Sequence, residues 1–184
     1  MRRLVFLALL ALMVAGIPAG ASTFLVMNQG ELIRDSAAVV EGEVLQVHSF
    51  WTRSGRIIVT EAIVKVSDPI LGEAASAVVV RTFGGTVEGF TVEAHGFPTF
   101  RKGERLLLFL EAERDGAHKV AGYQQGQYRV VRDKNGFDVA VPAFDGHASL
   151  VTRDGRQAAR PKALPLSLLK DQIRTEARRL GRAQ

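Results

Sequence analysis

Apolar and polar residues alternate along most of residues 38–142, and turn residues separate the alternating runs. In residues 57–67, every second side chain is apolar or threonine and falls on one face, which is typical of a β-strand with one buried side. We expect Asp68-Pro69 to end this strand. The other predicted strands, mostly joined as antiparallel neighbours, are residues 39–50, 77–83, 86–93, 104–113, 117–121, 127–132 and 137–141.

Two further features predict how these strands are arranged. Asn135-Gly136, between the last two runs, is the strongest short-range signal for a β-hairpin. Strands of about ten residues or more twist and curl, and glycine bulges help them to do so. Glycines at positions 42, 89, 122 and 126 are well placed for such bending. The sequence therefore predicts a mainly β domain, a closed or nearly closed antiparallel barrel.

Two segments outside the strands have helical patterns. Asn28 is a good N-cap residue and Glu31 follows in the capping-box position, which predicts a short helix over residues 29–35. Beyond a linker at residues 153–165, apolar residues recur at steps of three and four and predict an amphipathic helix over residues 166–182. Its apolar stripe consists of Leu166, Leu169, Ile173, Ala177 and Leu180. The stripe is narrow and lacks Trp and Phe, so we expect it to dock on the barrel domain, residues 22–152, rather than on a membrane.

The first 21 residues have the pattern of a secretory signal peptide. Arg2 and Arg3 precede an apolar run over residues 4–14, and Ala19-Gly20-Ala21 matches the small-residue cleavage site. The alternative, a membrane anchor, needs roughly 18 or more apolar residues, and this run is shorter. Cleavage after Ala21 would remove 21 of 184 residues and leave 163, with no integral membrane segment. We therefore expect a periplasmic or secreted protein.

Composition and charge narrow the functional classes. The chain has no cysteine, which excludes disulfides, cysteine nucleophiles and thiolate metal sites. Residues 22–152 carry 13 basic and 16 acidic side chains, whereas residues 153–184 carry 9 basic and 3 acidic ones. A basic tail can contact nucleic acid, lipid headgroups or an acidic partner. We favour a solvated helix face and expect no nucleic-acid partner.

The sequence contains none of the common catalytic or nucleotide-binding motifs. Glu41 and Glu43 share one face of a strand, and we expect both to point to solvent. Asp145 and His147 lie on one loop, where a metal or acid–base pair is one interpretation and a polar surface turn is the simpler one. The histidines are far apart in sequence, and their spacing predicts no metal site. We expect no metal and no cofactor.

Three aromatic residues are the candidates for ligand binding. Trp51 follows Phe50 at the end of a predicted strand, as a stacking platform or, as we favour, a rim residue that closes the barrel. Phe97 and Phe100 flank Pro98 in a loop before the most apolar strand. This loop either plugs the barrel or forms a binding lip, and the sequence does not decide between the two.

The order of elements resembles a known module. The segments that carry the resemblance are residues 35–44, residues 61–66, Pro69-Ile70-Leu71-Gly72, residues 78–80 and residues 103–110. Together they are similar to the netrin-like module of the tissue inhibitors of metalloproteases, which implies an OB-fold barrel with flanking helices. The Gly-Glu-x-x-Leu-Leu-Phe-Leu strand at residues 103–110 is closer still to small exported bacterial proteins of unknown role. The resemblance covers residues 24–141.

Inhibition of metalloproteases does not follow from the resemblance. Those inhibitors chelate the protease zinc through an N-terminal cysteine, whereas this chain would begin at Ser22 after cleavage and has no cysteine. The fold and the missing catalytic motifs favour a non-catalytic binding or interaction module, which would engage a secreted protease or an envelope component. The rival hypothesis is a small hydrolase or metal-dependent enzyme on the same barrel, with Asp145, His147 and His95 as its polar groups. The sequence does not predict the oligomeric state.

Overall fold

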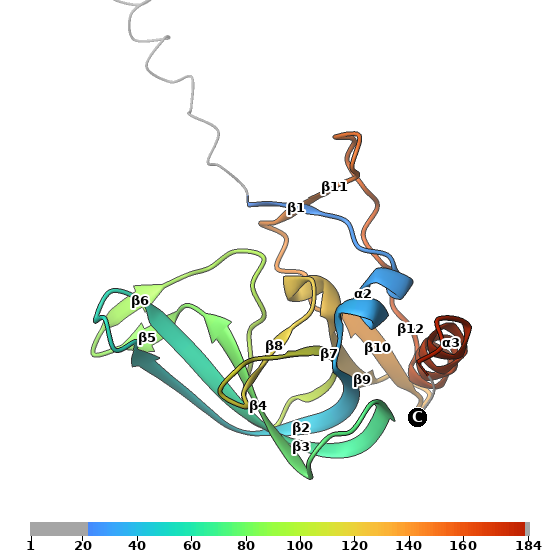
Figure 1. Cartoon of the computed structure of the whole chain (residues 1–184), viewed down its shortest axis with the longest axis horizontal. Helices are drawn as coiled ribbons and strands as arrows, with labels where there is room; N and C mark the ends of the chain where they lie inside the picture. The colour runs from blue at the N-terminus through green and yellow to red at the C-terminus, as the bar shows by residue number, and fades with distance from the viewer. Residues whose placement is uncertain (1–21, 183–184) are drawn as a thin grey trace, which may run out of the picture.

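The computed structural model describes residues 22–182, and its centre is a closed five-stranded β-barrel (Figure 1). The barrel strands are β2 (Ala38–Trp51), β3 (Ile58–Leu71), β4 (Ala77–Phe83), β7 (Arg105–Ala112) and β8 (His118–Val120). The first three form an antiparallel meander, and β7 returns beside β2, which is a Greek key. Strand β8 pairs antiparallel with β7 and meets β4 in parallel, which closes the cylinder. The predicted OB-like fold class is confirmed.

Register shifts interrupt the pairing of β2 with β3 at three points, and such irregularities bend a strand. The register between β2 and β3 shifts between Glu41 and Gly42, as in a β-bulge. A Cβ atom at Gly42 would lie 2.4 Å from the carbonyl oxygen of Lys65, so only glycine fits this close approach. Side chains that face inward fill the barrel with a continuous apolar cluster. Its members include Val44, Val64, Val80, Phe100, Leu106, Leu108 and Leu110.

A second apolar cluster lies between the outside of the barrel and two helices. The first half of β7 also pairs with β9 (Gln127–Arg132), and the sheet continues through β10 (Asp138–Pro142) to β12 (Leu164–Pro165). Helices α2 (Gln29–Asp35) and α3 (Leu166–Arg179) lie beside this extension (Figure 1). The cluster includes Ile33, Leu107, Phe109, Leu169 and Ile173. The C-terminal helix is therefore docked, and α2 has the predicted Asn28–Glu31 capping box.

Shorter elements cover the ends of the barrel. Strands β5 (Gly85–Val87) and β6 (Phe90–Val92) form a hairpin, and η1 (Tyr123–Gly126) is one turn of 3₁₀-helix before β9. Near the start of the described chain, β1 (Thr23–Leu25) pairs in parallel with β11 (Ser149–Val151). The signal-peptide prediction concerns residues 1–21, which lie outside the described residues. No helix within residues 22–182 is long and apolar enough to cross a membrane.

Two local predictions are wrong. Strand β3 does not end at Asp68-Pro69 but continues to Leu71. Strand β4 begins only at Ala77, opposite Lys65, so this last part of β3 lies beyond β4 and pairs with β2, and proline is tolerated at such an edge. Residues 86–93 are not one strand, because Glu88 and Gly89 both take positive φ angles and make a tight hairpin turn. The predicted linker, residues 153–165, contains the short strand β12 and a bridge from Gln157 to Val151.

Glu41 does not point to solvent as predicted. Its side chain is 8% exposed and accepts hydrogen bonds from Arg105 at 2.7 Å and Lys170 at 2.5 Å. Lys170 belongs to α3 and also contacts Asp68 of β3 at 2.8 Å. This ion-pair network therefore ties the C-terminal helix to two barrel strands.

Candidate functional site

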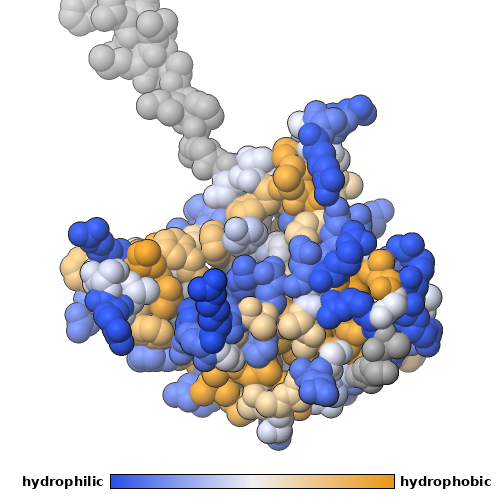
Figure 2. Space-filling model, viewed as in Figure 1, coloured by the Kyte–Doolittle hydropathy of each residue, from blue (hydrophilic) through white to orange (hydrophobic). Residues whose placement is uncertain are grey.

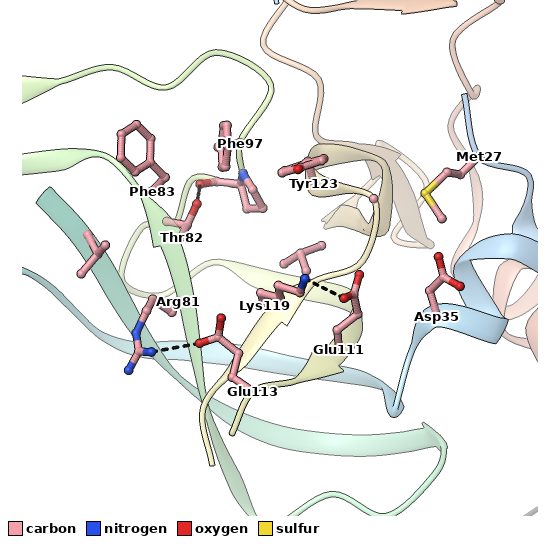
Figure 3. Close-up of a pocket in the computed structure, with 14 residues that line it drawn as sticks. Met27, Asp35, Arg81, Thr82, Phe83, Phe97, Glu111, Glu113, Lys119 and Tyr123 are labelled. Carbon is pink, nitrogen blue, oxygen red and sulfur yellow. Dashed lines mark hydrogen bonds and ion pairs between the residues drawn. The ribbon is translucent and has the colours of Figure 1, made fainter. Parts of the chain in front are cut away.

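The main candidate site is a cavity of about 400 Å³ on the outside of the barrel, which we call the aromatic groove (Figure 3). Strands β3, β4, β7 and β8 supply its floor, and the loops at residues 97–98 and 122–123 supply its upper wall. The side chains that line it include those of Met27, Asp35, Arg81, Phe83, Phe97, Glu111, Glu113, Lys119 and Tyr123. On the face shown in Figure 2, apolar side chains form a band from the β5–β6 hairpin toward β1.

Aromatic rings from three separate segments form the upper wall of the groove. The ring centroid of Phe97 lies 5.6 Å from that of Phe83 and 4.9 Å from that of Tyr123. Phe24 of β1 supports the wall from behind, with its centroid 4.9 Å from that of Tyr123. These are the tilted and edge-to-face contacts that aromatic pairs prefer. Phe83 is still 40% exposed and Tyr123 45% exposed, so the wall offers ring surface to a ligand.

The backbone holds Tyr123 in an unfavourable conformation. Its φ angle is +59°, directly after Gly122 at +62°. A non-glycine residue in this region is uncommon and costs on the order of 1–3 kcal/mol, so the surroundings must enforce it. They do so through the neighbouring Gln124, which is 2% exposed. Its backbone N–H donates to the carbonyl oxygen of Gly96 at 3.1 Å, and its side-chain amide donates to that of Phe97 at 3.0 Å. Strain of this kind is common at functional surfaces.

The floor of the groove is charged, and its cations are fully engaged. Arg81 contacts Glu61 at 2.6 Å and both Glu113 and Asp115 at 2.9 Å. The hydrogen bond that Arg81 donates to Glu61 raises the pKa of Arg81, and the one that Arg81 donates to Asp115 lowers the pKa of Asp115. Lys119 contacts Glu111 at 2.8 Å, and this bond raises the pKa of Lys119. The floor is therefore a set of ion pairs rather than a pair of free acid–base groups.

Asp35 completes the lining at the end nearest α2. It is the last residue of this helix, and Figure 3 shows its carboxylate in the groove beside Met27 and Glu111. Among residues 22–182, the structure gives its side chain no hydrogen bond and no ion pair. The lining of the groove thus has three carboxylates and two cations, and the carboxylate of Asp35 is the one without an ion pair.

A second cavity of about 450 Å³ lies at the mouth of the barrel and shares Thr82, Phe83 and Pro98 with the groove. Hydroxyl groups line much of it and bond one another or the backbone. Ser49 and Thr60 lie 2.7 Å apart, and Thr60 donates to the carbonyl oxygen of Gly84 at 2.7 Å.

The structure brings His95, His147 and Asp145 together at the rim of this mouth. The two imidazole centroids are 4.7 Å apart, and a carboxylate oxygen of Asp145 lies 3.8 Å from Nδ1 of His95. Burial favours a higher pKa for Asp145, but hydrogen bonds from the backbone N–H groups of Gly96 and His147 outweigh it and lower that pKa. Within residues 22–182, no group of three or more His, Cys, Asp or Glu is placed to hold a metal ion.

The three aromatic residues predicted to bind a ligand do not meet in one place. Phe97 lies in the wall of the aromatic groove. Phe100 is 8% exposed, and it belongs to the barrel core and lines the mouth from below. Trp51 packs against Phe90 of the β5–β6 hairpin, with centroids 6.1 Å apart, and lines neither cavity.

Sequence reasoning missed Phe83, Tyr123 and Asp35. A partial signal exists for Tyr123, because an exposed aromatic residue directly after Gly122 interrupts the alternation between two strands. Phe83 and Asp35 have no such signal, since each is the last residue of an ordinary element and only the fold brings them to the groove.

No protein-family model matches the chain, and no curated protein or solved structure is significantly similar to it. The OB-like class therefore rests on strand order and pairing. The netrin-like resemblance remains a prediction.

Proposed function

We propose that the protein is an exported, non-catalytic interaction module that binds a segment of a partner protein in the aromatic groove. The observation that carries the proposal is the wall of Phe83, Phe97 and Tyr123. Phe83 and Tyr123 stay exposed in it, although the backbone of Tyr123 is strained. Exposed aromatic side chains are enriched at the centre of protein interfaces and contribute much of the binding energy there. The pattern of residues 1–21 supports export.

The shape of the surface supports an extended partner rather than a compact one. A further cavity of about 530 Å³ adjoins the groove and shares Met27, Asp35, Gly122 and Tyr123 with it. It continues past β1 and the start of α2. Because the two cavities share four lining residues, they form one elongated surface, and such a surface suits several residues of an extended peptide chain.

Selection of peptides tests the proposal. A random peptide library is selected on the mature protein and then rescreened on a variant with Tyr123→Gly, which removes the ring and suits the positive φ angle. Peptides that bind the mature protein and lose binding on this variant would support the proposal. Trp51→Ala is the matched control, because it removes an aromatic ring outside the groove. A failure to select any peptide that depends on Tyr123 would overturn the proposal.

A second candidate function, a hydrolase or metal-dependent enzyme at the barrel mouth, is favoured by the meeting of His95, His147 and Asp145. These residues come from two loops far apart in sequence, yet they share one rim beside a hydroxyl-lined cavity. Metal analysis and a panel of ester, phosphoester and peptide substrates test it. Metal binding or turnover that His147→Ala removes would establish this function in place of the first.

A further inference from the structure

We propose that the aromatic groove recognises a basic side chain, a lysine or arginine of the bound peptide. This inference rests on the proposed function and specifies the chemistry of its ligand. The geometry places an unpaired carboxylate and exposed ring surface in one cavity, and a cationic side chain on an alkyl stem satisfies both.

The first argument is the charge of the cavity. Three carboxylates line it, those of Asp35, Glu111 and Glu113, against two cations, Arg81 and Lys119. Arg81 is also shared with two further carboxylates outside the lining, Glu61 and Asp115. The site therefore attracts positive charge, and an anionic ligand would meet repulsion there.

The second argument is that Asp35, an exposed residue, forms no ion pair with any cation within residues 22–182. Arg34 and Arg153 line the adjoining cavity with Asp35, but Arg153 pairs with Glu31 at 3.0 Å. Arg34 lies near Glu176 of α3, whose pKa is lowered mainly by a hydrogen bond from Arg179 and also by the charge of Arg34. Lys119 is held by Glu111, and the hydrogen bonds of Arg81 run to Glu61 and Glu113. The carboxylate of Asp35 is therefore available to pair with a cation of the ligand.

The third argument is the aromatic wall of the same cavity. Tyr123 and Phe97 line the same cavity as Asp35, with their rings 4.9 Å apart and 71° between their planes. Because the rings are tilted against each other, a cation that meets the edge of one can still lie over the face of its neighbour. A cation within about 6 Å of an aromatic centroid gains about 0.5–2 kcal/mol. The alkyl stem of Lys or Arg would pack on Met27 and the rings.

The experiment uses the selected peptides whose binding depends on Tyr123. They are labelled with fluorescein, and their affinity for the protein is measured by fluorescence anisotropy. In each peptide every arginine is replaced in turn by citrulline, and every lysine by norleucine, which keep the shape of the side chain and remove its charge. We expect one replacement to weaken binding about tenfold. The variant Asp35→Asn should weaken the charged peptide by a similar factor and leave the neutral peptide unchanged.

The matched control is Asp171→Asn, which removes an exposed carboxylate of α3 outside the groove and should change neither affinity. Selected peptides that depend on Tyr123 but contain no basic residue would overturn this inference and leave the interaction module standing. Equal affinity of the charged and neutral peptides would do the same. If no peptide depends on Tyr123, the interaction module itself falls, and this inference falls with it.

Discussion

Removal of one side chain from the buried stripe of α3 tests whether this helix is part of the fold. Ile173 is fully buried, in the cluster that also contains Ile33 and Phe109. Replacing such an isoleucine by alanine costs about 2–5 kcal/mol, from lost burial and from the cavity left behind. Ile173 is packed by two helices and the sheet, which limits collapse of the site. We therefore expect Ile173→Ala to lower the free energy of unfolding by about 3 kcal/mol.

Urea unfolding followed by circular dichroism measures this change. The matched control is Leu168→Ala on the same helix, because Leu168 is 47% exposed and should cost less than about 1 kcal/mol. For a domain of this size, about 3 kcal/mol corresponds to a fall in melting temperature of about 6–12 °C. Equal small losses for the two variants would show that α3 does not pack on the barrel in solution. Truncation after Pro165 should lower the melting temperature further.

Three further predictions concern the charged network, the strained tyrosine and the acid limb of stability. Glu41→Ala removes one partner of the half-buried Lys170 and should lower the free energy of unfolding, measured in urea, by about 3 kcal/mol. The double variant Glu41→Leu/Lys170→Met should recover this loss fully. An unchanged free energy of unfolding for Glu41→Ala would contradict the network. Tyr123→Gly should be about 1 kcal/mol more stable than Tyr123→Ala, since both lack the ring and only glycine suits the φ angle of +59°; equal melting temperatures would refute the strain. Because the pKa of Asp145 is lowered in the folded protein, Asp145 stabilises the fold above its unfolded pKa of about 3.9. This contribution is lost as the pH falls through the folded pKa. Asp145→Asn should therefore make the free energy of unfolding depend less steeply on pH in this acid range.

Local periodicity was enough to predict most of the barrel. Strands β4 and β9 begin and end where the alternation does, and the capping box of α2 needs only residues close in sequence. The errors arose where the outcome depends on a distant segment. Pro69 is accepted within β3 because β4 begins only at Ala77, opposite Lys65, and Glu41 is buried because α3 supplies Lys170. Neither fact can be derived from the residues around position 41 or 69.

The candidate site shows the same limit more strongly. Of its exposed wall, sequence reasoning found Phe97, because two aromatic residues around a proline stand out in a loop. Phe83 and Tyr123 reach the groove from the end of β4 and from η1, so their meeting depends on barrel closure. At the mouth of the barrel the sequence predicts more, since it indicates Asp145, His147 and His95 as one set of polar groups and the fold brings these three residues together.

The groove and the barrel mouth share one loop, and this determines how the two candidate functions are separated. His95 and Phe97 are two residues apart, and the carbonyl oxygens of Gly96 and Phe97 both accept hydrogen bonds from Gln124. A change at His95 would therefore move the aromatic wall as well as the rim. His147 lies on the other loop and meets the shared loop through its ring contact with His95 and through Asp145. His147→Ala with unchanged peptide affinity would show that the groove works without the mouth, whereas a common loss of binding and turnover would mean that the shared loop makes them one site.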